Sequence, residues 1–128
     1  MRYVFMAYRD QERWKALSAT ERARLELACR ASEDELRQTG LLSQSTGLES
    51  GRQAVSVRME AEGLSIFEGS GAATSENIVR IFEVEARDLN QAIQAAARMP
   101  QARMGPIEVR AVHEPGNSQP WSATQQEE

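Results

Sequence analysis

The sequence predicts an α+β domain in which two helices pack on one face of a sheet, and three observations lead to this class. Residues 3–8 and 78–85 are apolar at odd and even positions alike, as in strands that are buried on both faces. Two other segments combine a helix-start signal with apolar residues at helical spacing. Along the chain, the predicted elements follow the order β-α-β-β-β-α-β.

The first helix is expected over residues 19–39. Ser18 and Glu21 have the Ser-x-x-Glu spacing of a capping box, in which each side chain accepts a hydrogen bond from a backbone amide at the helix start. Gly40 follows the apolar stripe and readily adopts the left-handed conformation in which many helices end.

The second helix is expected to begin at Asp88 and to end before Pro100. Asp88 and Gln91 repeat the capping-box spacing. The apolar residues that follow recur at i, i+3, i+4, i+7 and i+8, and they are Leu89, Ala92, Ile93, Ala96 and Ala97. This stripe predicts a helix with one face against the sheet.

Shorter segments complete the order. The expected elements are an edge strand over residues 41–48, a hairpin of residues 54–59 and 64–67 around a turn at 60–63, and a last strand over 106–112. Residues 68–77 are mostly small and polar, so we expect a loop there. Loops that follow strands often carry functional sites.

The length and composition fit one domain. Of 128 residues, 41% are apolar and 27% charged, and we assign residues 1–113 to the domain and 114–128 to a flexible acidic tail. Cys29 is the only cysteine, so no disulfide can form within the chain, which favours a reducing compartment. The longest apolar run is far too short to cross a membrane, and a cytoplasmic location is therefore expected.

Charge and missing motifs exclude several classes of function. A net charge of -4 disfavours nucleic acid and anionic membranes as partners. The sequence has no CxxC, HExxH, GxSxG, P-loop or GxGxxG pattern, and one histidine with one cysteine cannot build a Cys/His metal site. We therefore predict neither a metal nor a cofactor.

Two helices separated by pairs of strands suggest a ferredoxin-like split β-α-β sheet with both helices on one face. The other face would stay bare, although residues 3–8 and 78–84 are apolar toward it as well. A second copy of the chain, placed sheet against sheet about a two-fold axis, is the simplest cover. A homodimer is therefore expected.

Candidate functional residues begin at the end of the first strand. Tyr8 and Asp10 could place a phenol and a carboxylate beside a pocket. The alternative is that Asp10 caps a turn and Tyr8 packs in the core.

The loop offers a second set of candidates. Glu68-Gly69-Ser70-Gly71 permits unusual backbone angles and could present amides to an anion, while Thr74, Ser75 and Glu76 could add hydroxyls and a carboxylate. A flexible turn explains the same composition. Glu83 and Glu85 could form an acid–base pair, or they could be solvated or paired with arginine.

Several stretches of the chain carry a resemblance to a known family: residues 2–8 with 14–18, 85–92, 98–100 and 105–110. They are similar to the YCII-related family, in its DGPF-domain branch, and the resemblance spans about residues 1–114. It implies a ferredoxin-like, dimeric α/β barrel. It also suggests a link to extracytoplasmic-function sigma factors, whose genes often lie beside those of DGPF-type proteins.

The sequence departs from the family pattern at the residues that matter for function. Some relatives are thought to use a His-Asp pair, whereas this chain has no histidine before His113. Glu68-Gly69-Ser70-Gly71 stands where the family has Asp-Gly-Pro-Phe, and Thr74 and Glu76 persist from the segment that follows.

Two functions are predicted. The first is binding of a small molecule near the barrel end, with Asp10 and Glu68 as acid–base groups and Tyr8, Ser70, Thr74 and Glu76 as binding residues. The alternative is a non-catalytic interaction module that acts on transcription machinery through its dimer surface and tail.

Overall fold

The computed structural model describes residues 1–69 and 76–115, and it shows a mixed α+β fold. The strands are β1 (Arg2–Asp10), β2 (Leu42–Gly47), β3 (Val55–Glu60), β4 (Gly63–Glu68), β5 (Glu76–Glu85) and β6 (Ile107–Ala111). The helices are α1 (Gln11–Ala16), α2 (Ala19–Gln38) and α3 (Leu89–Ala97), with short 3-10 turns η1 (Gly51–Gln53) and η2 (Pro100–Arg103).

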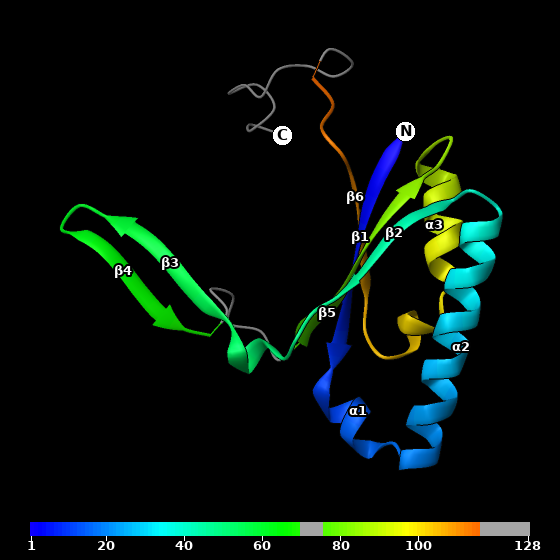
Figure 1. Cartoon of the computed structure of the whole chain (residues 1–128), viewed down its shortest axis with the longest axis horizontal. Helices are drawn as coiled ribbons and strands as arrows, with labels where there is room; N and C mark the ends of the chain where they lie inside the picture. Colours follow the sequence, from blue (N-terminus) through cyan, green and yellow to red (C-terminus); the bar gives the residue numbers. More distant parts are fainter. Residues whose placement is uncertain (70–75, 116–128) are drawn as a thin grey trace.

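Four strands form the main sheet, in the order β2-β5-β1-β6, and every neighbouring pair is antiparallel. The sheet is open, with β2 and β6 at its edges, and it does not close into a barrel within one chain. The hairpin β3–β4 forms a separate two-stranded sheet that projects away from the helices (Figure 1).

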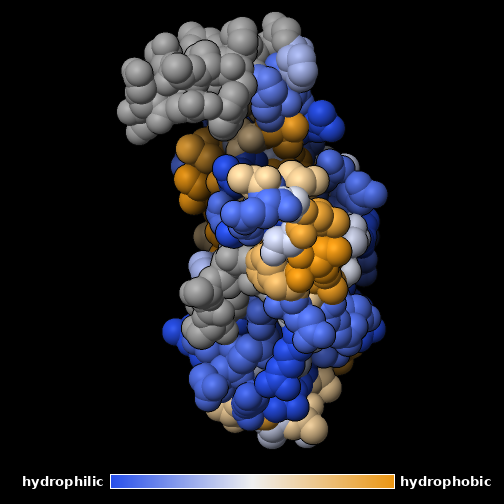
Figure 2. All heavy atoms as spheres, turned by 90° about the vertical axis from the view of Figure 1, so that its left-hand side faces the viewer, coloured by the Kyte–Doolittle hydropathy of each residue, from blue (hydrophilic) through white to orange (hydrophobic). Residues whose placement is uncertain are grey.

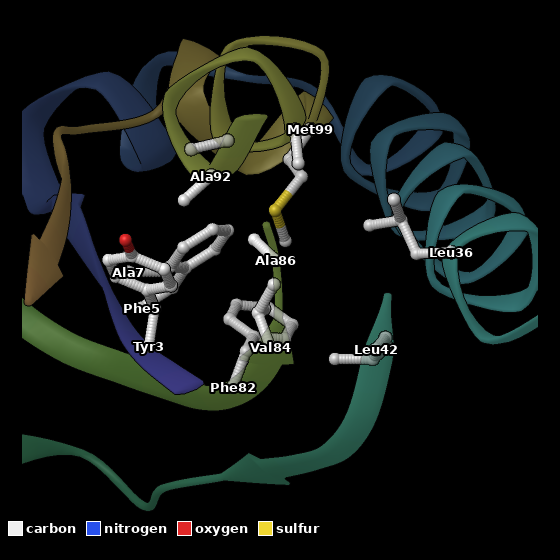
Figure 3. Close-up of a cluster of buried hydrophobic side chains, with 12 residues drawn as sticks. Tyr3, Phe5, Ala7, Leu36, Leu42, Phe82, Val84, Ala86, Ala92 and Met99 are labelled. Carbon is white, nitrogen blue, oxygen red and sulfur yellow. The ribbon is translucent and has the colours of Figure 1, made fainter. Parts of the chain in front are cut away.

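One face of the main sheet carries the core. Phe5 and Phe82 are register partners on β1 and β5, and both are 0% exposed. Leu36 from α2 and Ala92 from α3 belong to the same core (Figure 3). Both helices therefore cover one face, as the sequence pattern predicts.

The opposite face of the sheet is only half-buried. Alternation along β1 directs Val4 and Met6 away from the helices, and Met6 pairs with Ile81 on β5. The sequence predicts that both faces of these strands are buried. Within one chain, only the face that carries the helices is fully buried.

Local signals determine both ends of α2. Ser18 Oγ accepts from the backbone N–H of Glu21 at 3.1 Å, and Glu21 Oε1 accepts from that of Ser18 at 2.9 Å, which confirms the capping box. At the other end, Gly40 has a φ of 81° and the Leu41 amide donates to the Leu36 carbonyl at 3.0 Å. This left-handed turn ends the helix.

The start of α3 differs in one detail from the expected capping box. Asp88 Oδ1 accepts from the Gln91 amide at 2.8 Å, as expected. The Gln91 side chain, however, accepts from the Arg87 amide at 2.7 Å and not from that of Asp88. The first bond satisfies an amide that the helix itself leaves open, and the second ties the residue before the cap to the first turn.

Two elements differ from the sequence prediction. A short helix, α1, follows β1 directly because Asp10 caps it, whereas no helix was expected there. The strand β5 begins at Glu76, inside the expected loop. Of the expected tail, only Glu114 and Pro115 are described, and Glu114 Oε1 accepts from Arg2 Nε at 2.9 Å.

Among the helices of the described segments, none combines the length and the apolar composition that a membrane crossing requires.

Candidate functional site

A cavity of about 500 Å³ lies between α2 and one end of the main sheet. Its walls come from the β1–α1 junction, the middle of α2, the connection from β2 to η1, the start of β5, and η2. Apolar side chains such as Leu25, Val79 and Met104 share the lining with charged ones. The charged lining residues are three arginines and two glutamates, namely Arg9, Arg30, Arg80, Glu26 and Glu33.

Arg9 is held in the cavity wall by an aromatic ring. Its guanidinium carbon lies 3.7 Å from the centroid of the Trp14 ring, a cation–π arrangement. Burial lowers the pKa of Arg9 below its ordinary value, an effect that the carboxylate of Glu26 opposes. Within residues 1–69 and 76–115, Arg9 forms neither an ion pair nor a side-chain hydrogen bond. This half-buried cation therefore has donors available to a ligand.

A hydrogen-bonded network forms the opposite part of the wall. Glu33 on α2 is only 7% exposed, and its Oε1 accepts from Ser45 Oγ at 2.6 Å. Arg80 Nη1 donates to Ser45 Oγ at 2.9 Å and lies 4.0 Å from Glu33 Oε1. Arg37 approaches the same carboxylate oxygen at 3.9 Å. Two guanidinium groups thus compensate the buried charge of Glu33.

A break in strand register brings Arg80 to the cavity. Ala7 pairs with Arg80 and Tyr8 with Ile78, so the register skips Val79. An extra residue of this kind changes the direction of the side chains around it. Val79 and Arg80 consequently both line the cavity, although they are adjacent in sequence.

Two further lining residues are polar and partly enclosed. Burial raises the pKa of the Cys29 thiol, and the nearby charge of Glu33 adds to the rise. The side-chain oxygen of Gln101 is buried and accepts no hydrogen bond within the part of the chain that the structure describes. The cavity therefore also offers neutral polar groups.

The structure separates the residues that the sequence singled out. Tyr8 lines the cavity, and its hydroxyl donates to Glu108 Oε1 at 2.9 Å. Asp10 does not line it, because its Oδ1 accepts from the amides of Glu12 and Arg13 at 3.0 and 3.4 Å. That capping role is the alternative that the sequence left open for Asp10.

The loop candidates lie elsewhere or outside the description. Glu68 ends β4 on the separate hairpin, is exposed and does not line the cavity. Ser70 and Thr74 lie outside the described residues. Glu76 belongs to β5, where its backbone pairs opposite Asp10.

The remaining acidic pair does not converge on a site. Glu83 and Glu85 lie on β5, and Glu85 Oε1 accepts from the amino terminus at 3.2 Å. The described residues contain no group of three or more His, Cys, Asp or Glu side chains that could hold a metal ion.

Sequence reasoning missed Arg9, Trp14, Glu33 and Arg80 as a set, although Glu33 and Arg80 each left a signal. Glu33 lies between Cys29 and Leu36 on the inward side of the first predicted helix, where a charge is unusual. Arg80 interrupts the apolar run over residues 78–82. Nothing local indicates that these residues meet, because four separate elements, β1, α1, α2 and β5, bring them together.

Comparison with known proteins adds no relative to these observations. The resemblance to the YCII-related family therefore stays a prediction. No protein-family model matches this sequence, and no curated protein matches it significantly.

Proposed function

We propose that this protein binds a small carboxylate with an apolar body in the cavity beneath α2. The observation that carries the proposal is Arg9, a half-buried guanidinium that lies on the Trp14 ring and forms no ion pair or side-chain hydrogen bond with the described residues. A guanidinium fork suits a carboxylate because two of its N–H groups can donate in parallel.

The size and lining of the cavity support a small molecule. Its volume of about 500 Å³ lies within the range of about 300–1,000 Å³ that is common for small-molecule sites. Leu25, Val79 and Met104 could contact an apolar body while Arg9 holds the anionic end. Cationic side chains outnumber anionic ones in the lining, which also favours an anion.

Catalysis, if the bound molecule is turned over, would rest on a different carboxylate from those that the sequence suggested. Glu33 lines the cavity, and its hydrogen bond with Ser45 fixes its carboxylate beside the space that a bound molecule would occupy. Asp10 is occupied as a helix cap and Glu68 is on the hairpin. We therefore assign any acid–base role to Glu33.

The fold and assembly suggested by the sequence are part of the proposal. The strand order β2-β5-β1-β6 with α2 and α3 on one face supports a ferredoxin-like domain. The half-buried apolar side chains of Val4, Met6 and Ile81 on the other face support a homodimer that covers them. A closed barrel, as in the YCII-related family, would arise only across two chains.

The alternative function is a non-catalytic interaction module, and the exposed hairpin favours it. Five large apolar side chains on β3 and β4 are more than half exposed. Such a patch commonly marks a protein-binding surface. A partner from the transcription machinery rests on the family resemblance alone.

A thermal-shift titration with benzoate, phenylacetate and hexanoate tests the proposed ligand class. We expect at least one to raise the melting temperature of the wild type, because a ligand that binds only the folded state stabilises it. Arg9→Gln should weaken that ligand about tenfold or more, since charge-assisted hydrogen bonds are lost. Arg24→Gln, an exposed change on α2 outside the cavity, is the matched control. No shift with any carboxylate, or equal shifts in all three proteins, would contradict the proposal.

A further inference from the structure

The β3–β4 hairpin is an arm that stands apart from the domain. It is inserted between β2 and β5 and forms a sheet of its own (Figure 1). Its base is closed by a hydrogen bond of 2.7 Å from the Gly69 amide to the Ala54 carbonyl. We refer to residues 55–68 as the arm.

One face of the arm is apolar over most of its length, with Glu68 opposite Val55 at the base as its one charged residue. Val57 pairs with Ile66 and Met59 pairs with Leu64, so the four side chains share a face with that of Val55. These five side chains are 59–75% exposed. Figure 2, which looks at the molecule from the side of the hairpin, shows an apolar patch gathered toward the viewer.

The opposite face of the arm has a different composition. Ser56, Arg58 and Ser65 lie there together with Phe67. The difference matters because a solvated arm would have no reason to collect its large aliphatic residues on one side. A two-stranded hairpin in water is also marginally stable unless its apolar face is covered.

The same chain carries a second uncovered apolar surface, the open face of the main sheet. Val4, Met6, Ile78 and Ile81 are half-buried there, with α2 and α3 on the other side. The arm projects in the direction away from those helices (Figure 1). A molecule that covers the open face therefore also meets the arm.

We propose that the apolar face of the arm packs against the open sheet face of a second copy of this chain, reciprocally about a two-fold axis. This inference rests on the proposed homodimer and adds the contact that holds it. A second copy fits these surfaces because each chain carries both an apolar arm and an open sheet face. One two-fold axis then places each arm on the sheet of the other chain and covers all four surfaces.

The dimensions of the two surfaces also fit. Six-residue strands extend about 20 Å at roughly 3.4 Å per residue. Four strands spaced about 4.8 Å apart make a sheet of similar width. One arm can therefore cross the sheet of its partner, with Met59 and Leu64 near the tip and Val55 at the base.

Cross-linking between two differently labelled copies tests this contact. One copy carries Met59→Cys on the arm, the other Met6→Cys on the open face, and both carry Cys29→Ser because Cys29 is the only native cysteine. After the copies are mixed and equilibrated, a short bis-maleimide should join the two kinds of chain. Adding Val57→Ser and Ile66→Ser to both copies should lower that yield about tenfold, whereas adding Arg58→Ser on the other face should leave it unchanged.

Light scattering on the same samples separates failure of the arm contact from failure of the dimer. A dimer in which the mixed cross-link does not form, or in which only arm joins arm, overturns the arm contact and leaves the dimer standing. A monomer at micromolar concentration overturns both. If deleting residues 116–128 abolishes the dimer while the arm substitutions have no effect, the tail is the cover and the arm proposal is wrong.

Discussion

The guanidinium of Arg9 lies over the ring of Trp14, 3.7 Å from its centroid, although a strand holds one residue and a helix the other. Asp10, between them, caps α1 by accepting from the Glu12 amide at 3.0 Å. A second arginine, Arg22 of α2, donates through Nε to the Trp14 carbonyl at 3.1 Å. The Arg22 guanidinium carbon also lies 5.5 Å from the centroid of the same ring, so the ring contacts two arginines and can fix the direction of Arg9.

Two substitutions at Asp10 distinguish a helix-capping role from a catalytic one. Asp10→Asn should leave the stability of the fold almost unchanged because asparagine caps helices as well as aspartate does. Asp10→Ala should lower the free energy of unfolding by about 1 kcal/mol. Urea unfolding measures both, and ligand binding by Asp10→Asn should match the wild type. Loss of turnover in a folded Asp10→Asn variant would restore the catalytic role predicted from the sequence.

Ser45 should be important for stability because it is the donor to a buried carboxylate. Ser45→Ala removes the 2.6 Å bond to Glu33, and leaving a buried acceptor without its donor costs about 1–3 kcal/mol. Ser43→Ala is the matched control on the same strand, since its exposed hydroxyl donates only to the Glu83 carbonyl. Chemical denaturation of the two variants should separate them clearly, and equal effects would mean that the Glu33 network contributes little.

Cys29 should react slowly with alkylating agents at neutral pH. Burial raises the pKa of its thiol, so less of the reactive thiolate is present than in a free cysteine. The alkylation rate should therefore rise only at more alkaline pH than for a model thiol, as followed by mass spectrometry. A bound carboxylate should slow the reaction further, because Cys29 lines the same cavity.

The same shift makes a contribution to stability that depends on pH. In the unfolded chain, Cys29 ionises at its ordinary pKa, whereas the folded state keeps its proton to higher pH. The contribution of Cys29 to the free energy of unfolding is therefore complete below the pKa of the unfolded chain. It declines as the pH rises from that value through the higher pKa of the folded state. Cys29→Ser should flatten that alkaline decline in a pH series of thermal melts.

Gly105 should tolerate no side chain. A Cβ at this position would overlap the backbone carbonyl of Tyr8, which cannot move aside without disturbing β1. Gly105→Ala should cost at least about 2 kcal/mol of unfolding free energy. Gly51→Ala should cost less, because the group it meets is the mobile side chain of Asn77. Equal melting temperatures for the two variants would contradict this reasoning.

Features set by neighbouring residues were the ones that the sequence predicted well. Ser18 with Glu21 and Gly40 marked the two ends of α2, because capping depends on residues within one turn. The strand around Phe82 was recognised by its β-branched and aromatic residues, which are apolar at odd and even positions alike. The short helix α1 was missed because its six residues carry no apolar stripe and depend on the cap from Asp10.

The candidate site could not be assembled from the sequence because it depends on long-range contacts. Glu33 and Ser45 meet only because α2 packs beside β2, and Arg80 reaches them through the register break opposite Ala7. The hairpin was predicted, but its separation from the main sheet was not. Alternation along β3 shows which residues share a face and does not show what that face contacts.

The hydrogen bond at the base of the arm makes residues 55–68 an insertion that could be replaced as one unit. Because Ala54 and Gly69 are already joined by a hydrogen bond, a short turn could replace the whole hairpin without rethreading β2 or β5. Insertions of this kind let a lineage change the association of a domain while its cavity stays intact. The residues that line the cavity and the residues of the arm can in this way change separately.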